Sequence, residues 1–157
     1  MIREIIKEIE MIIIEQDIED EGEGHILFSV AETQKSSPDE TILVKGCVDY
    51  CISSVEINLP DNLTIDGYLL LADCLELKNL PKNLKVIGMG SIDVSGCIKL
   101  NDIPEDCIAR VITLSGSGVR KLRDNLKFNT IFVKPEDVNK MREINPFYAD
   151  IIKADWG

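Results

Sequence analysis

The sequence predicts an α/β solenoid in which short parallel strands are stacked and a helix covers each end. Three observations lead to this prediction: a short apolar phrase recurs between residues 42 and 133, a helical apolar pattern precedes it, and a proline-led helix signal follows it. A chain of 157 residues that is 45% hydrophobic is expected to form one globular unit. We divide it into an acidic N-terminal helix and strand cap (1–41), a repeat region (42–134) and a C-terminal helical cap (135–157).

The first element is an amphipathic helix over residues 2–16. Isoleucines at positions 2, 5, 6, 9 and 13 recur at helical spacing, with charged residues between them. Because the polar face is acidic rather than basic, we expect this helix to cover the end of the repeats and not to lie on a membrane. The charges also exclude a signal-peptide core and a membrane span.

An acidic segment follows. Residues 1–40 carry a net charge of −9, out of −11 for the whole chain. Such a chain is not expected to bind nucleic acid directly, but its carboxylates could bind a basic protein, including one that itself binds nucleic acid. A solvated loop is the simpler interpretation, and the spacing does not match a helix–loop–helix calcium site. The carboxylates of this candidate contact are Asp17, Glu19, Asp20, Glu21 and Glu23.

Two strands that could form a hairpin come next. Apolar residues alternate over 25–31, a polar turn covers 33–40, and a second strand is expected over 41–47. His25 is the only histidine, so catalysis of the Ser–His or Cys–His type would depend entirely on it. We see no serine or cysteine that the fold would bring to it.

The repeated phrase has two parts. The first part reads ILVKGC (42–47), LLLADC (69–74), IDVSGC (92–97), ITLSGS (112–117) and IFV (131–133), and its alternation predicts strands with one buried face. The second part reads LPDNL (59–63), LPKNL (80–84), IPEDC (103–107) and LRDNL (122–126). Its prolines predict an extended return path rather than a central strand. Positions 44, 71, 94, 114 and 133 recur at steps of 27, 23, 20 and 19 residues.

Segments 74–81 (CLELKNLP) and 97–104 (CIKLNDIP) resemble leucine-rich repeats of the Cys-x-x-Leu-x-x-Leu-Pro type. Segment 117–122 (SGVRKL) is similar to the shorter Asn-x-Leu-x-x-Leu type, and 58–67 (NLPDNLTIDG) is similar to repeats of small bacterial and phage proteins. The resemblance covers residues 42–133. It implies a bacterial or phage protein whose exposed strand surface binds a protein partner. The lack of a signal-peptide core and of a disulfide framework predicts a cytoplasmic location.

The residues between the buried strand positions are the candidate contacts of that surface. Three of them, Leu43, Leu70 and Phe132, are apolar where solvent is expected, so either a terminal segment covers them or they mark an interface. The full set is Leu43, Lys45, Leu70, Ala72, Asp93, Ser95, Thr113, Ser115, Phe132 and Lys134.

The five cysteines form no disulfide framework in the sequence, which predicts a reducing compartment. Cys47, Cys74 and Cys97 recur at one repeat position, which the resemblance assigns to backbone groups at the turn after the strand. Cys107 replaces a repeated leucine and is expected to fill the core. Cys47 and Cys51 have loose metal-ligand spacing, but without a Cys-x-x-Cys motif or a second histidine we favour structural thiols and no metal.

The C-terminal region begins with a helix signal at Pro135, Glu136 and Asp137. The helix is expected to end at Asn145-Pro146, and the aromatic tail that follows is expected to complete the cap. A partner-binding tail is the alternative, because aromatic residues make good anchors.

No phosphate loop, dinucleotide fingerprint or nucleophile elbow occurs in the chain. We therefore predict a non-enzymatic protein–protein interaction module without a cofactor. The alternative function is an acidic, phage-type inhibitor, of the anti-defence or anti-CRISPR kind, that blocks a nucleic-acid-binding protein by charge mimicry. A scaffold subunit would have the same sequence features.

Overall fold

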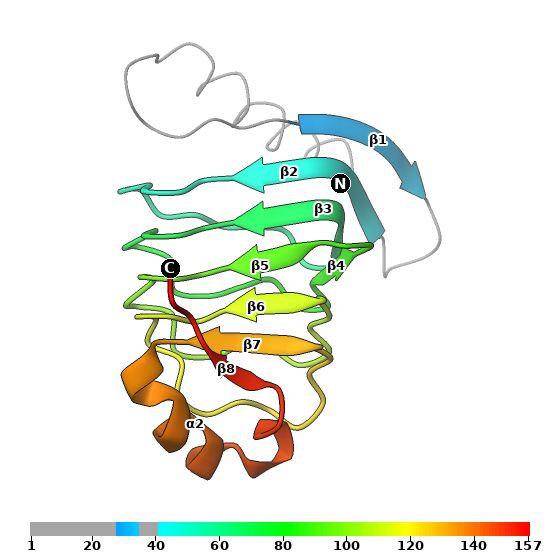
Figure 1. Cartoon of the computed structure of the whole chain (residues 1–157). Helices are drawn as coiled ribbons and strands as arrows, with labels where there is room; N and C mark the ends of the chain where they lie inside the picture. Colours follow the sequence, from blue (N-terminus) through cyan, green and yellow to red (C-terminus); the bar gives the residue numbers. More distant parts are fainter. Residues whose placement is uncertain (1–27, 35–40) are drawn as a thin grey trace.

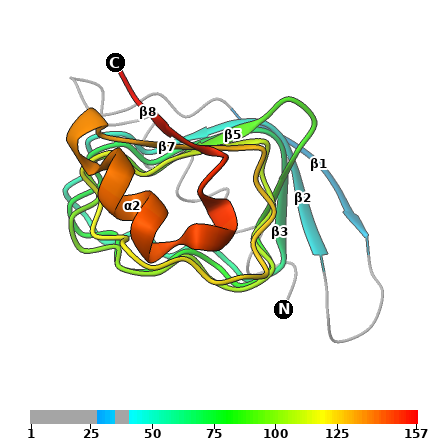
Figure 2. The ribbon, with the colours of Figure 1, turned by 60° about the horizontal axis from the view of Figure 1, so that its bottom comes forward.

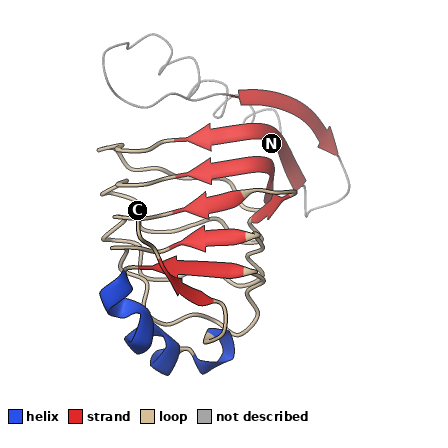
Figure 3. Cartoon of the chain, in the orientation of Figure 1, coloured by secondary structure: helices blue, strands red, loops and turns tan. Residues whose placement is uncertain are grey.

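The computed structural model describes residues 28–34 and 41–157 (Figure 1). Its elements are β1 (Phe28–Gln34), β2 (Thr41–Asp49), β3 (Leu63–Leu70), β4 (Lys85–Ile87), β5 (Ser91–Asp93), β6 (Val111–Thr113), β7 (Thr130–Val133), the 3-10 helix η1 (Pro135–Asp137), α2 (Val138–Ile144), the 3-10 helix η2 (Pro146–Tyr148) and β8 (Ile152–Ala154). The described helices all lie near the C-terminal end (Figure 3).

One mostly parallel sheet organises these elements, as expected for an α/β fold. The strand order is β1-β2-β3-β5-β6-β7-β8, with β4 paired to β3, so strands that follow one another in the chain are paired neighbours except for β4 and β5. Only the β1–β2 pair is antiparallel among the described strands. Figure 1 shows β2, β3, β5, β6 and β7 stacked in parallel, with the connecting chain returning behind them.

The predicted hairpin is confirmed, with different bounds. Phe28 pairs with Gly46 and Gln34 pairs with Thr41, so β1 begins and ends three residues later than expected. The strand therefore uses two residues of the predicted polar turn, and β2 continues past Cys47 to Asp49.

The register corrects the alignment of the first repeat. Val48 pairs with Leu69, and the same row continues through the later strands at steps of 21, 23, 20, 19 and 21 residues. Cys47 pairs with Tyr68, and continuing the register places Ser53 beside Cys74. The prediction that Cys47, Cys74 and Cys97 share one position is therefore wrong for Cys47. The central row consists of Val48, Leu69, Ile92, Ile112, Ile131 and Ile152.

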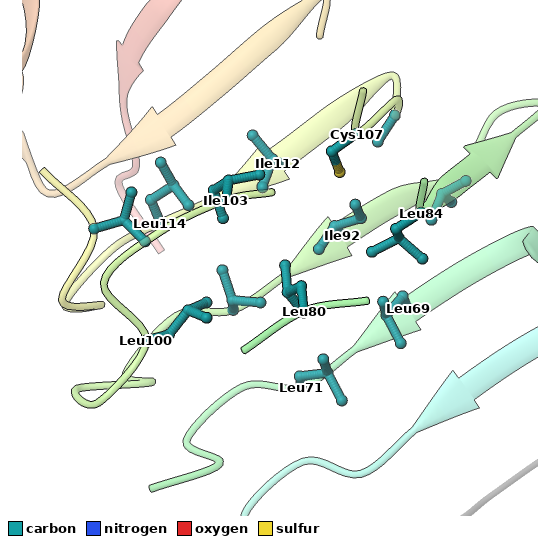
Figure 4. Close-up of a cluster of buried hydrophobic side chains, with 14 of the residues drawn as sticks. Leu69, Leu71, Leu80, Leu84, Ile92, Leu100, Ile103, Cys107, Ile112 and Leu114 are labelled. Atoms are coloured by element: carbon teal, nitrogen blue, oxygen red, sulfur yellow. The ribbon is translucent and has the colours of Figure 1, made fainter. Parts of the chain in front are cut away.

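This central row forms one wall of the core. Every member is 2% exposed or less, and leucines of the return path face it from the other side (Figure 4). Burying such a side chain stabilises the fold by about 1.5–3 kcal/mol. The residues of the return path that complete the core include Leu77, Leu80, Leu84, Leu100, Ile103 and Cys107.

The return path turns where the second phrase carries Asn or Asp. Asn62, Asn83 and Asp106 have φ of 60°, 55° and 61°, the left-handed conformation that these residue types tolerate best. The Asn83 Nδ2 donates to the Asn62 Oδ1 at 2.8 Å. Stacked turns of the same chemistry thus connect one strand to the next.

A second set of close contacts occurs where β3 exchanges its partner β4 for β5. A Cβ atom on Gly67 would lie 1.8 Å from the Gly46 carbonyl oxygen, and one on Gly90 would lie 1.8 Å from the Gly67 carbonyl oxygen. Glycine is therefore required at this bend of the coiled chain, seen in Figure 2. Gly88 and Met89 form the turn between β4 and β5.

The C-terminal segment is only partly helical, because its last element is β8. Helix α2 ends before Asn145-Pro146, as predicted. The chain then forms β8, which pairs in parallel with β7. In Figure 2, α2 and the turn after it lie across the outline of the coiled chain. Asn145 and Tyr148 of this segment are both buried.

These two side chains attach the segment to the preceding loop. Asn145 accepts from the Leu122 amide at 2.7 Å through Oδ1 and donates to the Arg120 carbonyl at 2.8 Å through Nδ2. The Tyr148 hydroxyl accepts from the Leu126 amide at 3.0 Å. Each bond satisfies a backbone group that would otherwise be unpaired next to the core.

Candidate protein-binding surface

The outward side of the parallel strands carries two adjacent rows of side chains, which we call the strand face. Eight of the ten predicted contact residues lie in these rows. The first row is Asp49, Leu70, Asp93, Thr113, Phe132 and Lys153. Two residues further along each strand, the second row is Cys51, Ala72, Ser95, Ser115, Lys134 and Asp155.

The two remaining predicted contacts lie elsewhere on β2. Leu43 pairs with Thr64, and Lys45 pairs with Asp66. The sequence placed them beside Leu70 and Ala72 because of the incorrect alignment of the first repeat. Asp49 and Cys51 occupy those positions instead, and sequence reasoning missed both.

The predicted apolar patch is not continuous. Leu43 is outside the two rows, and Leu70 and Phe132 are separated by Asp93 and Thr113. Three strand spacings amount to about 14 Å. The strand face is therefore a mixed surface of half-buried side chains, with Lys134 and Lys153 as exposed charges.

Two aspartates of the first row organise the strand ends. Asp49 Oδ1 accepts from the Cys51 amide at 2.9 Å, and Asp93 Oδ1 accepts from the Ser95 amide at 2.9 Å and its hydroxyl at 2.6 Å. This is the local side chain to backbone bonding that Asp makes at turns. These carboxylates hold the backbone at the point where the chain leaves the sheet.

The partly exposed thiol of Cys51 is a poor nucleophile. Burial, together with a hydrogen bond to Asp49, raises the pKa of Cys51 to about 12. Because the thiolate is the reactive species, this thiol stays protonated at neutral pH.

A buried row of thiols and hydroxyls lies behind the strand ends, made of Ser53, Cys74, Cys97 and Ser117. The Cys74 Sγ donates to the Tyr50 carbonyl at 2.9 Å, and the Cys97 Sγ donates to the Leu71 carbonyl at 3.0 Å. Hydrogen bonding to Cys74, with burial, raises the pKa of Cys97. The role that the resemblance implies is confirmed for Cys74 and Cys97.

Cys107 fills the core, as predicted. It is fully buried, and burial raises the pKa of its thiol to about 12. No group of His, Cys, Asp and Glu that could hold a metal ion occurs among the described residues.

The second predicted contact surface lies outside the described residues. This applies to the acidic segment of Asp17, Glu19, Asp20, Glu21 and Glu23, to the helix over 2–16 and to His25. All three stay predictions.

Four exposed apolar side chains lie in turns that the sequence did not single out. In the turns after β2, β3 and β5, Ile52 is 68% exposed, Val55 59%, Leu75 47% and Ile98 60%. We call these four residues the strand-exit patch. The signal was present in the sequence, because Leu75 and Ile98 directly follow the repeated cysteines and occupy a variable position of the Cys-x-x-Leu-x-x-Leu-Pro pattern.

The C-terminal tail also reaches the strand face. The Ser115 hydroxyl donates to Asp155 Oδ2 at 2.7 Å, so the chain after β8 is attached two strands away from its own. Trp156 is 84% exposed beyond this attachment, and Phe147 is exposed whereas Tyr148 is buried. The aromatic tail thus divides into one structural residue and two surface residues.

No family model, curated protein or solved structure matches the chain. In the part of the chain that the structure describes, no helix has the length and apolar character needed to span a membrane.

Proposed function

We propose that the chain is a non-enzymatic protein-binding module, built as a short leucine-rich-repeat solenoid, that contacts its partner through the strand face. The observation that carries the proposal is the continuous register of outward side chains from β2 to β8. A rigid sheet holds these side chains at fixed spacing, so a partner meets a preorganised surface.

The repeat spacing supports the solenoid. The central row recurs every 19–23 residues, and the residues that resemble repeat consensus positions, such as Leu77, Leu100 and Val119, are buried. A solenoid needs its end units covered, and we assign this role to the 2–16 helix and to the segment 135–157. The buried Met141 and Tyr148 support the second assignment.

The chemistry of the strand face favours binding over catalysis. Its two aspartates at the strand ends accept backbone hydrogen bonds, and the thiol beside them has a raised pKa. Half-buried polar side chains interspersed with Leu70 and Phe132 are typical of a contact surface. With a net charge of −11, the chain favours a basic partner, which includes proteins that bind nucleic acid.

The test is affinity capture from a host lysate with the full chain and two matched variants. Thr113→Arg places a cation in the middle of the strand face, whereas Asn79→Arg adds the same charge on the exposed return path. We expect a partner that the unmodified chain and Asn79→Arg retain equally, and that Thr113→Arg binds about tenfold more weakly.

Thermal unfolding of both variants separates lost binding from lost folding. A partner retained equally by all three proteins would show that the strand face is not the contact surface. If a partner is lost only when the carboxylates between positions 17 and 23 are neutralised, the acidic segment is the contact and charge mimicry becomes the better explanation.

A further inference from the structure

The strand-exit patch joins three consecutive turns at one edge of the sheet. Leu75 and Ile98 directly follow Cys74 and Cys97, which occupy one register position, so their side chains are neighbours across adjacent turns. Ile52 belongs to the turn after β2, where its amide donates to the Ala72 carbonyl at 2.8 Å. These turns are stacked beyond the arrowheads of β2, β3 and β5 in Figure 1.

Ile52 has a strained backbone conformation. The fold requires this conformation at the position but does not require an isoleucine there. Its φ is 65°, and the residues at the same register position in the next three turns are Asp73, Gly96 and Gly116, with φ of 58°, 70° and 71°. A β-branched residue in the left-handed region is a genuine outlier. Because the side chain is mostly exposed, its burial does not offset this strain, which points to a role outside the fold.

Negative charge borders the patch. Glu56 and Asp73 are exposed, and neither carboxylate has a side-chain partner among the described residues. By contrast, Glu76 forms an ion pair with Lys99 at 2.6 Å. The apolar patch is thus accompanied by uncompensated carboxylates.

We propose that the strand-exit patch docks an amphipathic segment of a partner protein, with apolar residues flanked by Lys or Arg. The inference rests on the proposed protein-binding function and adds a second contact surface to it. The charges select against two other occupants. A second copy of this chain would bring acidic rims together at a net charge of −11 each, and the chain's own first 40 residues carry −9.

The probes are two short amphipathic peptides of equal hydrophobicity, one of leucine and lysine and one of leucine and glutamate, titrated into the full chain by calorimetry. The patch variant is Leu75→Ser/Ile98→Ser. The matched control is Ile87→Ser/Met89→Ser, which removes two other exposed apolar side chains, at the end of β4 and in the turn after it.

We expect the lysine peptide to bind the unmodified chain and the control equally and the patch variant about tenfold more weakly. The glutamate peptide is expected not to bind. Equal binding of the lysine peptide to the patch variant, equal loss in the control, or no binding at all would overturn the proposal. Thr113→Arg reports separately on the strand face, and we expect it to bind the lysine peptide as the unmodified chain does. The proposed function and the docking of a peptide at the strand-exit patch can therefore be rejected independently.

Discussion

The turn after β2 and the turn after β6 share a left-handed residue and a backbone hydrogen bond at the same register positions but present different surfaces. Ile52 and Gly116 occupy one register position with φ of 65° and 71°. The residue that aligns with Leu75 and Ile98 in the later turn is Gly118, where a Cβ would lie 2.6 Å from the Leu100 carbonyl oxygen. The later turn is built for close packing against its neighbour, whereas the earlier turn presents an apolar side chain to solvent.

This difference separates the interior residues that stacking of the turns requires from the outer positions at which the residue type can vary. Inside the turns, hydrogen bonds to backbone carbonyls and buried aliphatic side chains recur from one strand to the next. Outside, residue type varies while the backbone does not. A residue whose type disfavours the backbone conformation of its position, such as Ile52, needs a functional explanation.

The largest expected effect comes from transferring isoleucine to a turn that has glycine. In Gly96→Ile, left-handed strain adds to the displacement of the Asp73 carboxylate, whose Oδ1 lies 1.9 Å from the position of a Cβ atom. We expect a loss of about 2–3 kcal/mol in the free energy of unfolding, measured by urea denaturation. Gly96→Asn is the control, since asparagine tolerates this conformation. Unchanged stability of Gly96→Ile would mean that the turns do not share one backbone.

A smaller effect tests the common interior through pH. Unfolded Cys107 ionises near pH 9, whereas the folded thiol stays protonated to about pH 12, so rising pH favours the unfolded chain. Between these values we expect Cys107 to lower the free energy of unfolding by about 1.4 kcal/mol per pH unit. The measurement is urea denaturation at several pH values, compared with Cys107→Val. Identical slopes for the two proteins would show that this thiol is not buried in the folded state.

Much of the fold follows from local patterns in the sequence. Alternation at Ile92 and Val94 predicts the strands, the Leu-Pro phrases predict the return path, and Asn145-Pro146 predicts the end of α2. These features depend on steric rules within a few residues. The sequence predicted the strands of the later repeats better than those of the first one for the same reason.

The remaining features depend on contacts distant in sequence. Gly46-Cys47 resembles Gly96-Cys97 in sequence, but Gly46 lies at a bend against Gly67 and not at a strand exit. Because the two dipeptides were aligned, Leu43 and Lys45 were wrongly included in the candidate site. The strand β8 is three residues long and exists because β7 offers an edge. Local pattern does not encode either pairing.

The most direct test of a partner-binding role at the turn after β2 is Ile52→Gly, with the melting temperature and the affinity for the leucine–lysine peptide measured on the same preparation. Relief of left-handed strain is expected to raise Tm by about 2–4 °C, while loss of the exposed side chain weakens peptide binding about threefold. Higher stability with weaker binding would show that Ile52 serves a partner at a cost in stability. Lower stability with unchanged binding would contradict this account and make Ile52 a structural residue.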